Sequence, residues 1–320
     1  MENSGMNDPR IEDTYAEAFP GLFFRFLVTG ERGITRKDRT SPYIEDDSLR
    51  AAAYRFSSTP STVVGRGEGG IECWLPKSQT PDEREGVVLQ YWGAYNEGKT
   101  LEEQVERLYK EVSIKVRQDV LSAPNGTTSL FDWMNRKTLR KVDAQKRIGD
   151  CGGGYEKEIL EYGRKRISVP LMMGYDFTVD KELSVAEGVS GANFWILSDS
   201  VETGRMAGSA AIKAIKGVKN VITSFYSCPS GSMVDDYNLI GPPTNYQFCP
   251  SLRGKIADSK VPDGVNSIPE IVINGVNLKS VENAMKEGML AALAVKGVKG
   301  ISAGNYDGKL GRYQIRLRNL

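Results

Sequence analysis

The stretch SVETGRMAGSAAIKAIKGVK, residues 200–219, returns as SVENAMKEGMLAALAVKGVK, residues 280–299. Ser-Val-Glu opens both copies, Lys-Gly-Val-Lys closes both, and Gly208 corresponds to Gly288 at the same constant offset. Self-similarity at a fixed spacing indicates a repeated structural unit. The carboxyl half of the chain therefore encodes one unit twice.

Each copy is predicted to form a strand, a helix and a second strand. Ser200 and Ser280 stand at helix N-cap positions, and the Ala-rich segment after each of them ends near a Gly. Two such units in tandem make the split βαβ, ferredoxin-like arrangement, in which both helices pack on one face of an antiparallel sheet. The predicted strands are 192–197 and 221–225 in the first copy, and 271–273 and the stretch from residue 301 in the second.

The amino half shows the same order of elements. Apolar or β-branched runs at 23–28, 62–64 and 87–92 predict strands, residues 47–57 predict a helix, and helical spacing from Thr100 onward predicts a long helix. The expected fold class is therefore α+β, with two lobes that are each a ferredoxin-like antiparallel sheet covered by helices on one face.

The length of the chain suits two domains. With 320 residues, 40% of them hydrophobic, it can bury a substantial core. We place the boundary in the charge-rich segment 136–166, which includes Cys151-Gly152-Gly153-Gly154. The predicted domains are residues 1–150, an N-terminal ferredoxin-like lobe, and residues 151–320, a C-terminal ferredoxin-like lobe that contains the repeat.

Charge and hydropathy exclude several classes of protein. Lys and Arg number 42 against 41 Asp and Glu, so the formal net charge is +1 and the basic surface of a nucleic-acid-binding protein is missing. No window has the apolar length of a spanning helix, and residues 1–5 lack the basic and apolar regions of a secretory signal. We expect a cytoplasmic protein without a nucleic-acid partner or membrane association.

The sequence contains no histidine, which excludes imidazole-based nucleophile pairs and imidazole metal sites. The four cysteines, Cys73, Cys151, Cys228 and Cys249, include no C-x-x-C pair, so neither a zinc ribbon nor a thioredoxin-type site is expected. Acid–base chemistry must then use carboxylates, Lys, Tyr or Cys. We expect no metal site.

The segment GRGEGG, residues 65–70, matches the G-x-G-x-x-G pattern of dinucleotide-binding proteins. That motif requires a strand before it and a helix opening at it, because the pyrophosphate binds free backbone N–H groups at the helix N-terminus. Residues 71–76 lack helical periodicity and end in a proline. A glycine-rich bend between two extended segments is favoured, and a nucleotide-binding oxidoreductase is the alternative.

Glu270 directly precedes the apolar run 271–273 and is a candidate for proton transfer. A carboxylate on a strand buried by helices would be desolvated, which raises its pKa toward the value that a proton donor at neutral pH requires. The alternative is a place on the solvent face of a half-buried strand, and the burial statistics for Glu favour it when only the local sequence is considered.

The glycine-rich run SAGNYDGKLG, residues 302–311, is a second candidate site. Its glycines would let the backbone approach a planar or carboxylated ligand, and Asn305 and Lys309 supply one amide and one amine. The alternative is a hairpin between Ile301 and Tyr313, with which Asp307-Gly308 is equally consistent.

These stretches resemble the formylmethanofuran:tetrahydromethanopterin formyltransferase family of C1 metabolism. The similarity covers nearly the whole chain, and the motifs occur in the family's order. They are Ile11 to Phe19, Glu68-x-Gly70-Ile71-Glu72-Cys73, Thr80-Pro81-Asp82, Gly154-Tyr155-Glu156, Gly188-Val189-x-Gly191-x-Asn193-Phe194, Cys249-Pro250, Glu270 to Gly275 and Ile301 to Gly311.

The resemblance implies a duplicated ferredoxin-like fold in a homodimer or homotetramer, with the active site near a subunit contact. It also implies transfer of a formyl group from the amine of methanofuran to a ring nitrogen of tetrahydromethanopterin, both co-substrates, without metal or prosthetic group. Glu270 matches the family's buried catalytic glutamate, and a carboxyl group with a raised pKa can carry a proton and stabilise an oxyanion. The residues expected to contact substrate are Glu68 and Gly70 in the first glycine loop, and Ser302, Asn305 and Lys309 in the second.

Three segments depart from the family's pattern: residues 225–232, residues 65–67 and an insertion around Asn125. The resemblance implies that the family holds its substrates at these places. A second hypothesis is therefore a non-catalytic or altered-substrate paralogue that acts as a subunit of a larger C1-metabolism complex.

Overall fold

The computed structural model describes residues 7–30, 48–57, 67–123, 128–223, 227–230, 245–309 and 311–320. The chain forms two compact units. Unit 1 comprises Met1–Gly21 and Gly188–Leu320, and unit 2 comprises Leu22–Glu187. Two long strands, β1 (Tyr15–Gly30) and β9 (Glu182–Ser198), contribute residues to both units.

The predicted domain boundary at residues 150 and 151 lies inside unit 2, in the 3-10 turn Gly149–Gly152. The amino-terminal segment packs with the carboxyl half because the start of β1 pairs antiparallel with β13, Tyr15 opposite Arg316 and Ala18 opposite Tyr313. Unit 1 is therefore assembled from two segments that are distant in sequence, whereas unit 2 is one continuous stretch.

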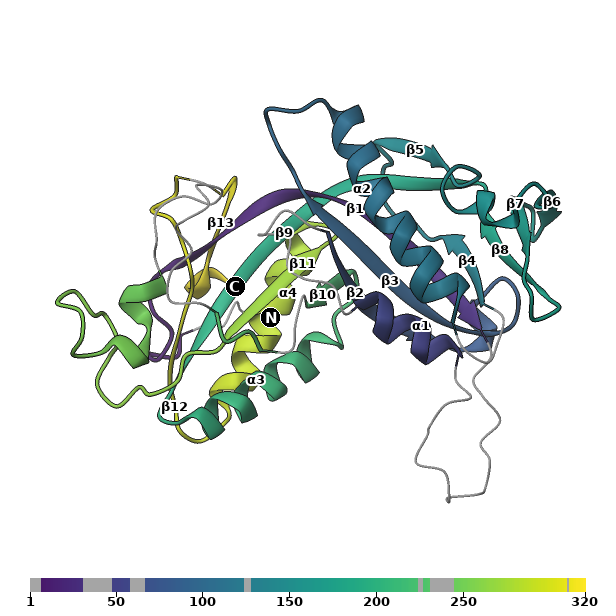
Figure 1. Ribbon diagram of the computed structural model, residues 1–320. Coiled ribbons are helices and arrows are strands. Elements are labelled where there is room, and N and C mark those ends of the chain that lie inside the picture. Colours follow the sequence, from purple (N-terminus) through teal and green to yellow (C-terminus); the bar gives the residue numbers. More distant parts are fainter. Residues whose placement is uncertain are drawn as a thin grey trace, which may run out of the picture. The chain divides into compact units, whose positions relative to one another are not determined.

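The sheet of unit 1 contains both copies of the repeat. Its strand order is β10–β11–β9–β12, with every neighbouring pair antiparallel, which is the order of the split βαβ arrangement. Helix α3 connects β9 to β10 and helix α4 connects β11 to β12, and the two helices lie side by side (Figure 1). The prediction from the repeat is confirmed. The remaining elements of unit 1 are α3 (Val201–Ile215), β10 (Val221–Thr223), β11 (Glu270–Gly275), α4 (Leu278–Leu293), β12 (Val298–Ser302) and β13 (Tyr313–Arg316), with 3-10 turns at Asn245–Phe248, Pro250–Leu252 and Leu317–Asn319.

The two repeat helices begin differently. Ser200 is the N-cap of α3, where its side chain accepts a hydrogen bond from the backbone N–H of Thr203. The N-cap of α4 is Asn277, whose side chain accepts from the N–H of Ser280. The N-cap prediction for Ser280 is wrong because Asn277, three residues earlier, supplies the capping oxygen and the helix starts there.

Unit 2 has the same central order, β2–β3–β1–β4, with α1 between β1 and β2 and α2 between β3 and β4. The sheet then continues through β8, β7 and β6, and β4 pairs with β8 in parallel. The sheet is therefore mixed, and the expectation of a purely antiparallel one is wrong. The elements are α1 (Ser48–Ser57), β2 (Glu68–Leu75), β3 (Glu85–Ala94), α2 (Leu101–Lys115), β4 (Thr128–Asp132), β5 (Arg140–Asp143), β6 (Lys157–Glu161), β7 (Arg164–Pro170) and β8 (Asp176–Asp180), with a 3-10 turn at Lys77–Gln79 and a π turn at Val116–Leu121.

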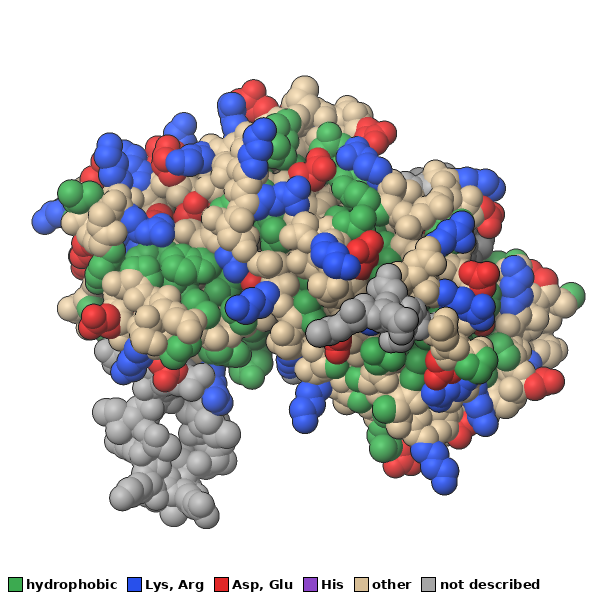
Figure 2. Space-filling model, turned by 180° about the vertical axis from the view of Figure 1, so that it is seen from behind, with side chains coloured by type: hydrophobic (Ala, Val, Ile, Leu, Met, Phe, Trp, Pro, Cys, Tyr) green, Lys and Arg blue, Asp and Glu red, His purple; other side chains and the backbone are tan. Residues whose placement is uncertain are grey.

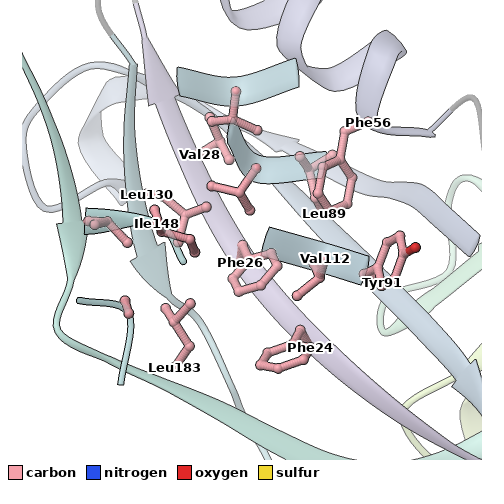
Figure 3. Packing of buried hydrophobic residues seen from close by; sticks show 14 of the residues in the cluster. Phe24, Phe26, Val28, Phe56, Leu89, Tyr91, Val112, Leu130, Ile148 and Leu183 are labelled. Carbon is pink, nitrogen blue, oxygen red and sulfur yellow. The ribbon is translucent and has the colours of Figure 1, made fainter. Parts of the chain in front are cut away.

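Alternation along β1 separates the two faces of the unit 2 sheet. Phe24, Phe26 and Val28 point together into the main core (Figure 3), which also contains Phe56 of α1 and Val112 of α2. Successive strand residues face opposite sides, so Leu27 packs on the other face, in a separate cluster with Val88 and Phe131. Both helices of this unit therefore cover one face of its sheet, as predicted.

Lys and Arg side chains are interspersed with Asp and Glu over the face seen in Figure 2, in keeping with the near-neutral total. Within the described ranges, no helix is long and apolar enough to cross a membrane.

Candidate active site

Glu270 is the first residue of β11, and its backbone and side chain both contact neighbouring segments. It pairs with Trp195 of β9, and backbone hydrogen bonds join it in both directions to Cys228, at 2.9 and 2.7 Å. Ile271 and Ile273 point into the core under α3 and α4, so alternation places the side chain of Glu270 on the opposite face. Elements other than the two helices must therefore desolvate it.

The carboxyl group of Glu270 is held by an indole. Trp195 Nε1–H donates to Oε1 of Glu270 at 3.2 Å. Burial raises the pKa of Glu270, while hydrogen bonds from Trp195 and Ser230 act in the opposite direction because they stabilise the ionised form. Burial is the larger effect, so this carboxyl keeps its proton to a higher pH than an ordinary glutamate.

A cavity of about 500 Å³ opens beside Glu270. Its aromatic wall is formed by Trp195 and Phe248, whose ring centroids lie 5.0 Å apart. Arg205 of α3 also lines the cavity, and the volume is in the range of sites that enclose a small organic ligand. The polar side chains around it are Ser227, Ser230, Asn245, Ser251, Asn266 and Ser267.

Two further titratable groups interact with Glu270. Burial raises the pKa of the Tyr306 phenol, and the carboxylates of Glu270 and Glu17 raise it further, so this hydroxyl remains a hydrogen-bond donor. Burial likewise raises the pKa of the Cys228 thiol, with a contribution from Glu270. A thiol that stays protonated is a poor nucleophile, so Glu270 is the better candidate for chemistry.

Residues 303–309 form a loop after β12 and not one side of a hairpin. Strand β12 pairs with β9 and strand β13 pairs with β1, so the segment joins strands that have different partners. The hairpin alternative is wrong because the strands on either side of Asp307-Gly308 do not pair with each other. Ser302 lies opposite Trp195 in the register of β12 and β9, which places the start of the loop next to β9, the strand that carries the indole bonded to Glu270.

The side chains of Ser302 and Asn305 are engaged within unit 1. Ser302 Oγ donates to Glu12, and Asn305 Nδ2 donates to Thr14 Oγ1 and to the carbonyl of Tyr15, both at 3.2 Å. These hydrogen bonds tie the loop to residues 12–15, so the two side chains stabilise the conformation of the loop.

Lys309 is exposed, and its amine lies 3.5 Å from Asp307.

Glu68 and Gly70 lie in unit 2, where they begin β2. A strand follows the first glycine loop where a dinucleotide site needs a helix, so the predicted extended segment after it is confirmed. Residues 62–66, Asn125, and residues 225, 226, 231 and 232 of the departing segments lie outside the described residues.

Across the parts of the chain that the structure describes, no group of three or more Cys, Asp and Glu side chains is arranged to hold a metal ion.

Residues 5–171 match the family model for formylmethanofuran-tetrahydromethanopterin formyltransferase, and residues 175–320 match the model for its proximal lobe. The chain belongs to this formyltransferase family. A formyltransferase-like protein of Archaeoglobus fulgidus is 42% identical over 316 residues, which cover 98% of this chain and 97% of that protein. The formyltransferase of Methanocaldococcus jannaschii is 38% identical over 322 residues, covering 98% and 99%.

Two solved structures of formyltransferase relatives match over almost the whole chain. The formylmethanofuran:tetrahydromethanopterin formyltransferase from Methanosarcina barkeri has a TM-score of 0.79 at 34% identity and covers 99% of both chains. A chain of the formyltransferase/hydrolase complex FhcABCD from Methylorubrum extorquens, solved with methylofuran, has a TM-score of 0.80 at 26% identity and covers 96% of this chain and 95% of that one. The resemblance found in the sequence is thereby confirmed.

Several residues of this candidate site were not predicted from the sequence. Trp195 lies in the apolar run ANFWIL, and the alternation of strand residues places it on the face opposite the core residues Phe194 and Ile196. A buried Trp usually donates its N–H to a polar partner, and this was the one signal in the sequence for its contact with Glu270. Ser230, Phe248 and Tyr306 lie in loops and turns, and their contacts with Trp195 and Glu270 depend on how those segments fold. No local sequence pattern predicts such contacts.

Proposed function

We propose that this chain transfers a formyl group between the amine of methanofuran and a ring nitrogen of a tetrahydromethanopterin-type carrier, in the cytoplasm and without a tightly bound cofactor. The supporting observation is Glu270, a carboxyl group desolvated at the edge of a cavity and oriented by Trp195. Membership of the formyltransferase family supplies the reaction class.

The proposed chemistry needs a group that can hold a proton near a developing oxyanion. The ring nitrogen attacks the formyl carbon, a C–N bond forms and the carbonyl electrons move to oxygen. A protonated Glu270 donates a hydrogen bond to that oxygen as its charge develops. When the C–N bond to the other amine breaks, the proton lost by the attacking nitrogen is delivered to the leaving one, and a carboxyl group with a raised pKa can carry it.

Substrate contacts are proposed for both glycine loops. Lys309, exposed on its loop, is suited to an anionic or carbonyl group of a substrate, and Ser302 and Asn305 act by shaping the same loop. Glu68 and Gly70 are proposed to contact substrate at the start of β2.

The test is a formyl-transfer assay that follows formation of the formylated pterin by the purified protein and by Glu270→Gln. The amide keeps the shape and a donor but removes the titratable proton, so we expect turnover to fall by roughly a hundred- to a thousand-fold, the usual cost of losing an oxyanion donor. Glu287→Gln, the same change at an exposed position of α4, is the control. Melting temperatures check folding, and near wild-type turnover in a folded Glu270→Gln protein would refute the assignment.

A second candidate function is that of an altered-substrate or non-catalytic subunit of a larger C1-metabolism complex. Identity to relatives named formyltransferase-like reaches 42% and 41%, above the 38% and 36% to relatives named formyltransferase. Absence of transfer by the isolated protein, with activity restored by added partner subunits, would favour this function. Light scattering on the purified chain tests the proposed homodimer or homotetramer.

A further inference from the structure

Two segments at opposite ends of the sequence are joined into one substructure. The residue pair Ile11 and Ile301 forms a parallel bridge, with Glu12 N–H donating to the Ile301 carbonyl at 3.0 Å. Side chains add to this backbone contact, since Ser302 donates to Glu12 and Asn305 donates to Thr14. The amino-terminal segment before β1 therefore forms a support for the loop that follows β12.

Glu17 is the centre of that support. The residue is only 1% exposed, and its Oε1 accepts hydrogen bonds from the backbone N–H groups of Tyr306 at 2.7 Å and Gly308 at 2.5 Å. Its Oε2 accepts a third, from the N–H of Gly311 at 2.5 Å. Hydrogen bonds to an ionised acceptor are about twice as strong as neutral ones, so one carboxylate anchors three points of the loop.

The two glycines make this close approach feasible. Gly308 has a φ of 71°, in the left-handed region that favours glycine. A Cβ at Gly311 would lie 2.7 Å from the Cβ of Glu17, closer than side chains approach. The backbone of the loop is thus shaped to wrap around this one carboxylate.

The other end of the loop rests on the residue that holds Glu270. Gly304 N–H donates to Asn193 Oδ1 at 2.7 Å, and the Gly304 carbonyl accepts from the backbone N–H of Glu17 at 3.3 Å. A Cβ at Gly304 would lie 3.1 Å from Cζ2 of Trp195, whose indole donates to Glu270. Tyr306 lies between these two anchored ends, and the charge of Glu270 contributes to the raised pKa of its phenol.

We propose that Glu17 is a positioning residue, which fixes the loop of residues 304–311 against Trp195 and thereby sets Tyr306 and the loop backbone beside Glu270. The kinetic part of this inference rests on the proposed formyl transfer, and the structural part rests on the hydrogen bonds of Glu17 alone.

The first readout is amide hydrogen exchange in Glu17→Gln. Replacing one carboxylate oxygen with an NH₂ group removes an acceptor and places a donor against backbone donors. We expect faster exchange in peptides that contain residues 304–311, with α3 and α4 unchanged, because only the loop loses its hydrogen bonds. Unchanged loop exchange would overturn the proposal.

The second readout is steady-state formyl transfer. A displacement of about 1 Å can cost on the order of a hundredfold, so we expect kcat/KM to fall by roughly ten- to a hundredfold in Glu17→Gln. Glu17→Asp keeps the carboxylate on a shorter side chain and should recover part of both the exchange protection and the activity. Wild-type activity in a variant whose loop exchanges faster would overturn the positioning role.

The control is Val112→Ala, a core truncation in unit 2 that lowers stability without touching the loop. If that variant, at a similar fall in melting temperature, lost as much activity as Glu17→Gln, the effect would be one of stability and the proposal would fail. If Glu17→Gln does not fold, Asn305→Ala, which removes the contacts to Thr14 and Tyr15, should still speed loop exchange and lower kcat/KM. If Asn305→Ala changed neither the loop exchange nor kcat/KM, that result would contradict the proposal.

Failure of the proposed function is distinguishable. A wild-type protein that transfers no formyl group would refute formyl transfer, and Glu17 would then be judged on loop exchange and on calorimetric binding of tetrahydromethanopterin. Weaker pterin binding together with faster loop exchange in Glu17→Gln would support the positioning role, and unchanged binding would overturn it.

Discussion

Trp195→Phe should change the pH dependence of both activity and stability. Trp195 is 5% exposed, donates to Oε1 of Glu270 at 3.2 Å and packs against Phe248. Phenylalanine retains an aromatic ring in this wall of the cavity but has no N–H group. The substitution therefore removes one hydrogen bond from Glu270, along with part of the ring volume.

The sign of the effect follows from the form of Glu270 that accepts the bond. A hydrogen bond to a charged group contributes about 1.5 to 3 kcal/mol, and here the indole stabilises the ionised carboxylate. Removing it raises the pKa of Glu270 beyond the increase already caused by burial. A Glu with a raised folded-state pKa contributes stability below its ordinary pKa, and that stability is lost as pH rises through the folded value.

The contribution of the lost hydrogen bond to the free energy of unfolding can be separated from the cost of the smaller ring. Lost packing destabilises the protein equally at pH 5 and pH 8, whereas the lost hydrogen bond matters only where Glu270 ionises. We therefore expect Trp195→Phe to reduce the free energy of unfolding by up to about 1.5 to 3 kcal/mol more at pH 8 than at pH 5. In kcat/KM against pH, the limb on which Glu270 loses its proton should move to higher pH.

Urea unfolding at the two pH values and the pH profile of formyl transfer check this prediction. Trp92→Phe is the matched control, because the indole of Trp92 is also buried but donates to the amide of Gln90, at 2.8 Å. It should lose the same stability at both pH values. Equal destabilisation of Trp195→Phe at pH 5 and pH 8, with an unmoved pH profile, would refute the reasoning.

Two further predictions concern the scaffold. In Gly288→Ala the new Cβ would lie 2.8 Å from Ile215 Cδ1 and 3.0 Å from Phe194 Cζ, so overpacking of about 1 to 3 kcal/mol should outweigh or cancel a helix-propensity gain of about 1 kcal/mol. Ile215→Val removes that Cδ1, and strictly additive unfolding energies in the double variant would contradict the clash. Thr100→Ala should cost about 1 kcal/mol in urea unfolding, since Thr100 and Glu103 form a capping box at α2, and an unchanged midpoint would show that the cap contributes nothing.

Local pattern accounts for the elements that the sequence predicted well. Helix α2 begins after Thr100 because a capping box and helical spacing coincide there, and α3 begins after Ser200 for a similar reason. The apolar run of residues 23–28 predicts a strand, and these residues lie in β1. Such signals lie within a few residues of each other, which is why they can be read without the fold.

The site was predictable only in part. The resemblance to a family identified Glu270 and the glycine-rich run 302–311 as site residues. The local sequence around Glu270, considered alone, favoured a position on the solvent face of its strand. Its raised pKa comes from burial that no neighbouring residue in the sequence specifies. Trp195, the residue that orients it, is brought beside it by strand pairing across 75 residues.

The amino-acid sequence by itself determined the repeated strand–helix–strand units and the starts of α2 and α3. Only the tertiary structure decided that residues before 22 join the carboxyl half, that β4 pairs with β8 in parallel, and that Glu17 anchors a loop nearly 300 residues away. The physical reason is that periodicity and capping report contacts between near neighbours. Hydrogen bonds between distant segments form only after the sheets have assembled, and they leave no local pattern in either segment.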